Sequence, residues 1–135
     1  MGQSGVILVD TNVVLWLAFE PARLSKKAKE TLDEARQTQD GLAISDITLL
    51  EIATLANKGR VHLNSTLETF LQEVEARFVV VPINGVACAR TAALPAAYPK
   101  DPADRIIGAT ALVLGLALIT GDREIRQSKA LQTIW

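Results

Sequence analysis

Short, continuous apolar runs recur along the chain and are separated by longer segments of mixed polarity. Four such runs occupy residues 6–9, 42–45, 78–83 and 116–120, and a short fifth run lies at residues 131–135. They are rich in valine, isoleucine and leucine and do not alternate with polar residues. Runs of this kind are typical of strands that are buried on both faces of a sheet. The pattern therefore predicts four to five strands in the interior of the protein.

The segments between these runs carry apolar residues at helical spacing and begin or end with capping residues. Ser25, Ser65 or Thr66, and Asp101 with Pro102 are start signals, and Gly59 is a stop signal. Helices are predicted within residues 13–20, 24–37, 47–58, 67–77, 85–97 and 102–114. Strands that alternate with helices predict an α/β fold, in which helices cover both faces of a central parallel sheet.

Composition narrows the class of protein. The 135 residues, of which 49% are hydrophobic, suit a single domain over residues 1–135. A net charge of -1 excludes an overall basic field, and one cysteine with one histidine excludes both an internal disulfide and a Cys/His zinc site. The longest weakly polar run, residues 106–120, is shorter than the roughly 18 residues of a membrane span. We therefore expect a cytoplasmic protein without a membrane anchor.

Three aspartates lie where predicted strands end or helices begin. Asp10 follows the first strand, Asp122 follows the fourth, and Asp104 lies in the first turn of the helix that begins near Pro102. Taken singly, each is more typical of a helix cap than of a catalytic group. However, the carboxyl ends of parallel strands meet at one edge of a sheet, where ligands commonly bind. The three carboxylates are therefore expected to lie close together.

Glu51 is different because it lies in mid-helix and cannot cap the helix start. Its neighbours Leu49, Leu50 and Ile52 are apolar and are expected to be buried. A carboxylate in such a place needs a partner, either an arginine or lysine in an ion pair or a bound cation. On Glu51 alone, the two interpretations are equally supported.

Four carboxylates in one region repel one another unless a cation lies among them. Oxygen ligands without imidazole or thiolate select Mg²⁺ or Mn²⁺, both of which also bind phosphate oxygens. The chemistry that follows from such a site is attack of metal-activated water on a phosphodiester bond.

Four blocks of sequence carry these acids and their surroundings: VDTNVVLWL, SDITLLEIATLANKGRVHL, DPADRIIGATALVLGLALITGD and the terminal TIW. Together they resemble the PIN-domain ribonucleases, and most closely the VapC-type toxins of type II toxin–antitoxin systems. The resemblance implies a PIN-like three-layer sandwich and an endoribonuclease that depends on Mg²⁺ or Mn²⁺. Its catalytic metal ligands would be Asp10, Glu51, Asp104 and Asp122.

The same resemblance implies supporting residues and partners. Asn12 and Thr120 occupy positions that hydrogen-bond the ligands or a metal-bound water, whereas Asp101 fits a helix cap better than a ligand. Arg105, Arg123 and Arg126 follow the acids closely, so they either contact RNA or form surface ion pairs. The expected partners are an RNA substrate, a VapB-type antitoxin and a second copy of the chain.

Two alternatives remain at this stage. A PIN-domain nuclease that processes RNA without a toxin role has the same site, and an upstream antitoxin gene would distinguish the two. A non-catalytic, receiver-type signalling module also binds Mg²⁺ through aspartates. Such a module needs an adjacent acid pair near the first strand and a lysine after a late strand, and the sequence has neither.

Overall fold

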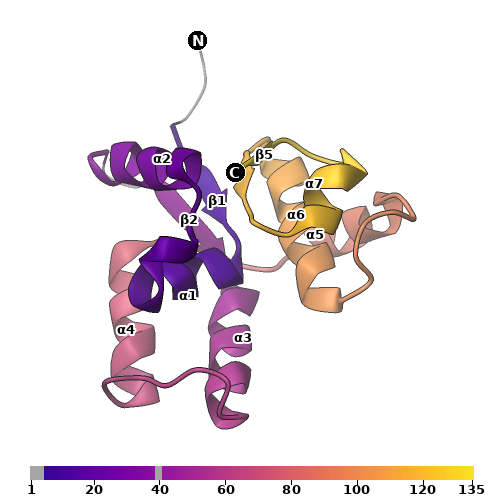
Figure 1. Cartoon of the computed structure of the whole chain (residues 1–135). Helices are drawn as coiled ribbons and strands as arrows, with labels where there is room; N and C mark the ends of the chain where they lie inside the picture. The colour runs from indigo at the N-terminus through magenta and orange to yellow at the C-terminus, as the bar shows by residue number, and fades with distance from the viewer. Residues whose placement is uncertain (1–4, 39–40) are drawn as a thin grey trace.

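A five-stranded parallel sheet forms the centre of the computed structural model, which describes residues 5–38 and 41–135 (Figure 1). The strands are arranged in the order β3-β2-β1-β4-β5, and every neighbouring pair is parallel. Their bounds are β1 (Ile7–Val9), β2 (Leu42–Ser45), β3 (Val79–Val81), β4 (Leu118–Ile119) and β5 (Thr133–Ile134). The predicted parallel α/β fold and each predicted strand are therefore confirmed.

Seven α-helices and two short 3-10 helices connect the strands within these described residues. Ser25, Thr66 and Asp101 cap the helices that they were predicted to start. The α-helices are α1 (Thr11–Phe19), α2 (Lys26–Arg36), α3 (Asp46–Asn57), α4 (Leu67–Arg77), α5 (Gly85–Arg90), α6 (Pro102–Leu114) and α7 (Arg123–Ser128). The 3-10 helices are η1 (Pro21–Arg23) and η2 (Thr91–Ala93).

One helix is shorter than predicted. The α-helical part of residues 85–97 ends at Arg90, and the chain becomes extended at Leu94. Leu94 precedes Pro95, and a residue before proline is disfavoured in the helical conformation.

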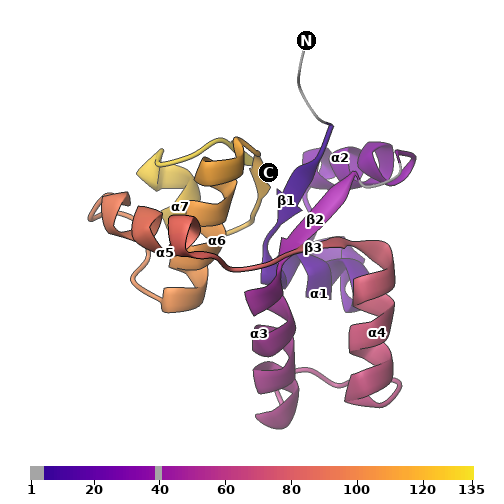
Figure 2. The ribbon, with the colours of Figure 1, turned by 180° about the vertical axis from the view of Figure 1, so that it is seen from behind.

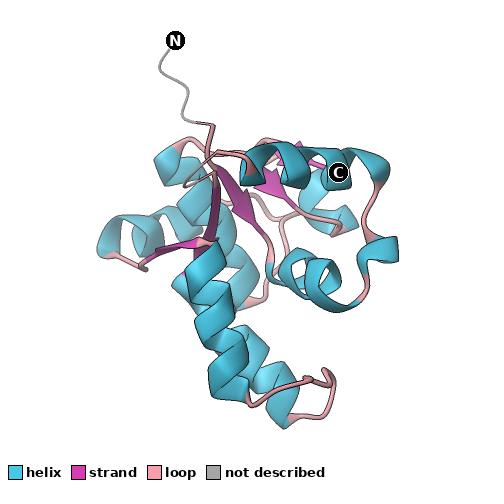
Figure 3. Cartoon of the chain, turned by 90° about the vertical axis from the view of Figure 1, so that its left-hand side faces the viewer, coloured by secondary structure: helices cyan, strands magenta, loops and turns pink. Residues whose placement is uncertain are grey.

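The alternation of side chains along the strands divides the core into two layers. Val9, Ile44 and Ile119 pack against α1, α2, α3 and α4 on one face of the sheet. Leu8, Ala43 and Leu118 pack against α5, α6 and α7 on the other face. Figure 2 shows the two groups of helices on either side of the strands, and Figure 3 shows α3 and α4 extending beyond the sheet. This is the predicted three-layer sandwich.

Tyr98 holds the first turns of α6 in place. Its side chain is 1% exposed, and its hydroxyl donates to the Asp104 backbone carbonyl at 2.7 Å. Gly108 permits this contact, because a Cβ atom there would lie 2.3 Å from the Tyr98 hydroxyl oxygen. Gly115 then ends α6 with a φ of 65°, a left-handed conformation that favours glycine. None of the described helices has both the length and the apolar character that crossing a membrane requires.

Candidate active site

Asp10 lies at the carboxyl end of β1 and caps α1, and its side chain is only 6% exposed. One carboxylate oxygen, Oδ1, accepts from the Thr11 backbone N–H at 2.9 Å. The other, Oδ2, accepts from the Thr120 hydroxyl at 2.7 Å. Burial raises the pKa of Asp10 because it disfavours the charged form, and the negative charge of Asp122 adds to the rise.

Thr120 joins the ends of two strands. It is fully buried at the end of β4, and its hydroxyl oxygen accepts from the Asp122 backbone N–H at 3.0 Å while the hydroxyl donates to Asp10. Asp122 in turn caps α7 through Oδ1, which accepts from Glu124 and Ile125. Asp10 and Asp122 are therefore connected through a single buried hydroxyl group.

Glu51 reaches this edge of the sheet from α3 and is held by hydroxyl groups. The Thr11 hydroxyl donates to Glu51 Oε1 at 2.5 Å, and the hydroxyl oxygens of Thr11 and Thr48 lie 2.9 Å apart. Thr11 has a single hydroxyl hydrogen, so Thr48 must be the donor to Thr11. A hydrogen-bond chain therefore runs from Thr48 through Thr11 to the Glu51 carboxylate.

Sequence reasoning missed the roles of Thr11 and Thr48. Thr11 stands inside the DTN block, and Thr48 precedes Glu51 by three residues on the same helix face, which is the signal that was available. Glu51 forms no ion pair, since the ion pair found in the described residues joins Arg23 to Glu20. One expectation about its surroundings is wrong, because Leu50 is 62% exposed.

Asp104 ties the four acids together electrostatically. Burial raises the pKa of Asp104, and together with the negative charges of Asp10, Asp101, Glu51 and Asp122 it brings this pKa to about 7. Burial also raises the pKa of Glu51, to which Asp10 and Asp101 add. Asp101 itself caps α6 by accepting from the Ala103 backbone N–H at 2.8 Å. The structure thus brings Asp10, Glu51, Asp104 and Asp122 into one cluster of mutually repelling carboxylates.

The other predicted residues differ in placement. The Arg105 guanidinium donates to the backbone carbonyls of Pro99 and Thr91, at 3.2 and 2.9 Å, and so braces the chain before α6. Arg126 reaches only the Gly121 carbonyl, at 3.5 Å, and its buried Nε has no partner in the described part of the chain. Arg123 is exposed at the start of α7. Asn12 is also exposed, and its side chain makes no hydrogen bond to the residues described.

The acid cluster has the chemistry of a divalent-cation site. All of its donors are carboxylate oxygens, and three of the carboxyl groups have a raised pKa that a nearby cation would reverse. Within residues 5–38 and 41–135, no three acidic, histidine or cysteine side chains lie close enough together to hold an ion between them. Mg²⁺ keeps several waters and uses one or two carboxylates, so the open arrangement suits it.

One protein family matches nearly the whole chain. The PIN domain family matches residues 7–131, and the chain belongs to this family. The receiver-type alternative is thereby removed.

Individual relatives sharpen this assignment. The chain is 36% identical to Ribonuclease VapC22 of Mycobacterium tuberculosis over 131 residues, which cover 96% of this chain and 98% of that protein. A toxin–antitoxin complex from Klebsiella pneumoniae has the same fold, with a TM-score of 0.63, 24% identity, and coverage of 93% and 94%. VapBC2 from Rickettsia felis, bound to a promoter DNA fragment, gives a TM-score of 0.70 at 14% identity, with coverage of 95% and 96%.

Proposed function

We propose that this chain is a divalent-metal-dependent endoribonuclease that acts as the toxin of a toxin–antitoxin pair. The observation that carries the proposal is the cluster of Asp10, Glu51, Asp104 and Asp122 at the carboxyl edge of the sheet, with three raised carboxyl pKa values. The similarity to a relative named a ribonuclease, over nearly the full length of both chains, supports the same activity here.

Each residue of the site has a proposed role. The four acids hold Mg²⁺ or Mn²⁺, and when bound such an ion supplies a Lewis acid that activates water and stabilises the leaving oxygen. Thr120, Thr11 and Thr48 fix the orientation of the carboxylates. For the exposed Asn12 side chain at the start of α1, the proposed role is a hydrogen bond to a metal-bound water. Of the three arginines, exposed Arg123 is the best placed to contact RNA phosphates.

Incubation with RNA tests the activity directly. Purified protein is incubated with cellular RNA in the presence of Mg²⁺, Mn²⁺ or EDTA, beside an Asp10→Asn variant whose fold is checked by circular dichroism. The wild type is expected to cleave RNA with either metal ion. No cleavage is expected in EDTA or by the Asp10→Asn variant. Metal-independent cleavage, or full activity of the variant, would contradict the proposal.

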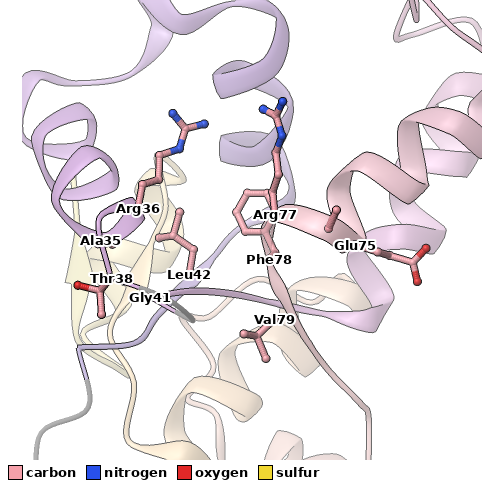
Figure 4. A pocket seen from close by; sticks show the side chains of 10 residues that line it. Ala35, Arg36, Thr38, Gly41, Leu42, Glu75, Arg77, Phe78 and Val79 are labelled. Atoms are coloured by element: carbon pink, nitrogen blue, oxygen red, sulfur yellow. The ribbon is translucent and has the colours of Figure 1, made fainter.

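The toxin role requires a surface for an antitoxin, and a groove at the other end of the sheet is suited to it. Two cavities of about 690 and 470 Å³ share Arg36, Arg77 and Phe78, and we call their joined surface the arginine groove. Figure 4 shows Arg36 and Arg77 extending toward the same side from α2 and α4. The other lining residues include Glu73, Glu75 and the apolar side chains of Leu17, Phe19, Phe70 and Val74.

This mixture of groups defines what the arginine groove would bind. The phenylalanines and leucine would receive the apolar face of a helical or extended peptide, and the two arginines would pair with its acidic side chains. An antitoxin segment with alternating apolar and acidic residues has these properties. A toxin that cleaves cellular RNA and is held by such a partner acts in the cytoplasm, where we place it.

We also propose a homodimer. Exposed apolar side chains occur on α3, α5 and α6, where Leu50, Val86 and Leu114 are 62%, 63% and 49% exposed. Large exposed apolar groups that gather on neighbouring elements are typical of protein interfaces. Sedimentation of the wild type and of Val86→Asp tests this proposal: a dimer is expected for the wild type and a monomer for the variant.

A further inference from the structure

Both tryptophans of the chain lie in one aromatic contact. Trp16 belongs to α1 and Trp135 follows β5, and their ring centroids are 5.7 Å apart with an angle of 57° between the planes. Both side chains are only partly buried, although each also packs against the core. We refer to Trp16 and Trp135 as the tryptophan pair.

The tryptophan pair lies at the same edge of the sheet as the acids. β5 is the neighbour of β4, and the Thr120 backbone N–H donates to the Ile134 carbonyl at 3.2 Å. Trp135 therefore follows β5 at the level where Thr120 and Asp122 follow β4. Trp16 belongs to the helix that Asp10 caps.

Gly121 shows how close the indoles come to the site. A Cβ atom at this position would lie 2.9 Å from a Trp16 ring atom and 3.0 Å from a Trp135 ring atom. In the chain, Gly121 lies between Thr120 and Asp122, and the Thr120 hydroxyl donates to Asp10. The tryptophan pair thus covers the backbone that connects two members of the acid site.

A positive charge accompanies the aromatic surface. The Arg23 guanidinium carbon lies 4.4 Å from the Trp16 ring centroid, which is a cation–π contact. Its other partner is Glu20 at 3.7 Å, and both of these side chains are more than half exposed. Exposed ion pairs of this kind contribute little, so Arg23 can exchange Glu20 for another anion at small cost.

We propose that the tryptophan pair and Arg23 form a binding subsite for an unpaired RNA base next to the scissile phosphate. The base packs against the indole surface, and Arg23 contacts a phosphate of the same strand. This inference rests on the proposed ribonuclease function and adds to it a subsite for one base of the substrate. Stacking on an indole needs a free base face, which bases in a duplex do not present, so the preferred substrate is single-stranded.

Intrinsic fluorescence tests the subsite without any substitution. Because both tryptophans lie in the pair, all tryptophan emission reports on this place. Oligoadenylate is titrated in EDTA, and binding is followed in parallel by the anisotropy of labelled RNA. We expect saturable quenching of the emission and protection from acrylamide, with binding at least about tenfold weaker for an oligo(A)–oligo(U) duplex. Binding by anisotropy without a tryptophan response, or no binding of single strands, overturns the proposal.

Paired variants separate stacking from packing. Trp135→Leu keeps apolar bulk but removes the aromatic face, and Trp135→Phe keeps a smaller face. In cleavage assays, KM for a single-stranded substrate should rise about tenfold in Trp135→Leu with little change in kcat, and Trp135→Phe should restore most of the loss. Equal KM values in the wild type and Trp135→Leu overturn the proposal. If Trp135→Leu does not fold, the wild-type fluorescence titration decides the question.

These readouts keep the subsite and the activity separate. Quenching by single strands without any RNA cleavage supports the subsite and contradicts the proposed function. Metal-dependent cleavage without any tryptophan response supports the function and contradicts the subsite.

Discussion

The two ends of the same sheet carry different chemistry. At the carboxyl end, Asp10 and Asp122 stand at helix starts beside Asp104 and Glu51, and burial raises the pKa of three of these four groups. At the amino end, α2 and α4 finish with Arg36 and Arg77 in their last turns, and both arginines line the arginine groove. The carboxyl end therefore gathers negative charge, whereas the amino end carries two arginines beside Glu73 and Glu75 of the same groove.

This difference follows from the parallel topology. Four helices, α1, α3, α5 and α7, start at the carboxyl end of the strand before them, where their free N–H groups favour acids. Each helix that returns to the next strand ends at the amino side, where free carbonyls favour basic residues. Helix capping explains where the acids lie, but it does not explain why they are buried, because a helix cap does not require a raised pKa. The excess negative charge indicates a cation site, and the exposed arginines indicate a site for an anionic partner.

The largest expected effect comes from neutralising Glu51 at the carboxyl end, with a glutamate at the amino end as the control. Glu51→Gln should reduce metal-dependent RNA cleavage by about a hundredfold or more, since a metal site supplies several kcal/mol of transition-state stabilisation. Glu75 is exposed on the wall of the arginine groove, and Glu75→Gln should leave the cleavage rate within about twofold of the wild-type rate. Initial rates at saturating Mg²⁺ measure both. Equal losses in the two variants would remove the distinction between the ends.

Reversing the charge of the arginine groove should release the antitoxin and spare cleavage. Arg36→Glu combined with Arg77→Glu is expected to weaken binding of the antitoxin's C-terminal peptide by about a hundredfold, because each charge-assisted hydrogen bond contributes about 1.5–3 kcal/mol. The matched control, Lys27→Glu with Lys29→Glu, makes the same charge change on the exposed face of α2. Calorimetry measures the affinities, and the prediction fails if both double variants weaken binding equally.

The hydroxyl chain behind Glu51 should have a smaller effect. Thr48→Val removes the donor to Thr11 with little change in shape, and Mn²⁺ affinity should fall about tenfold, as is typical for groups that orient metal ligands. Thr48→Ser should restore the affinity. Thr54→Val serves as the control, because its exposed hydroxyl donates only to the Leu50 carbonyl of the same helix. A purely structural role would lower the melting temperature without changing the affinity.

The smallest effect has the opposite sign. The pKa of Asp104 is raised to about 7 in the folded state, so the stability that its protonated form contributes is lost as pH rises from about 4 through 7. Asp104→Asn should therefore stabilise the metal-free protein at pH 8 by roughly 1 kcal/mol, after allowance for its partial exposure, or about 2–4 °C in Tm. The gain should vanish below pH 4. A variant that is less stable than the wild type at pH 8 would show that Asp104 has a favourable partner.

Local sequence signals predicted much of the fold. Continuous apolar runs marked all five strands, and caps such as Ser25 and Asp101 marked helix starts, because these signals act over a few residues. The helix α7 was not predicted, since its six residues are too few for a periodic pattern. The exposure of Leu50 was also missed, because apolar spacing does not reveal that α3 extends beyond the sheet.

The candidate site was predictable in its acids but not in its supporting contacts. Strand ends placed Asp10 and Asp122 together, since parallel topology alone brings those positions to one edge. The bonds from Thr11 to Thr48 and Glu51 join residues about forty positions apart and depend on how α1 packs on α3. The arginine groove likewise needs the ends of α2 and α4 to line the same cavity, so no short segment of sequence signals it.

Direct binding of a divalent cation tests the central claim, that the four acids form one metal site. Mn²⁺ is titrated into the metal-free wild type and into Asp10→Asn at pH 7.5, and the heat of binding is measured. The account predicts saturable binding to the wild type and at least about tenfold weaker binding to the variant. Equal affinities for both proteins, or no binding to the wild type, would contradict it.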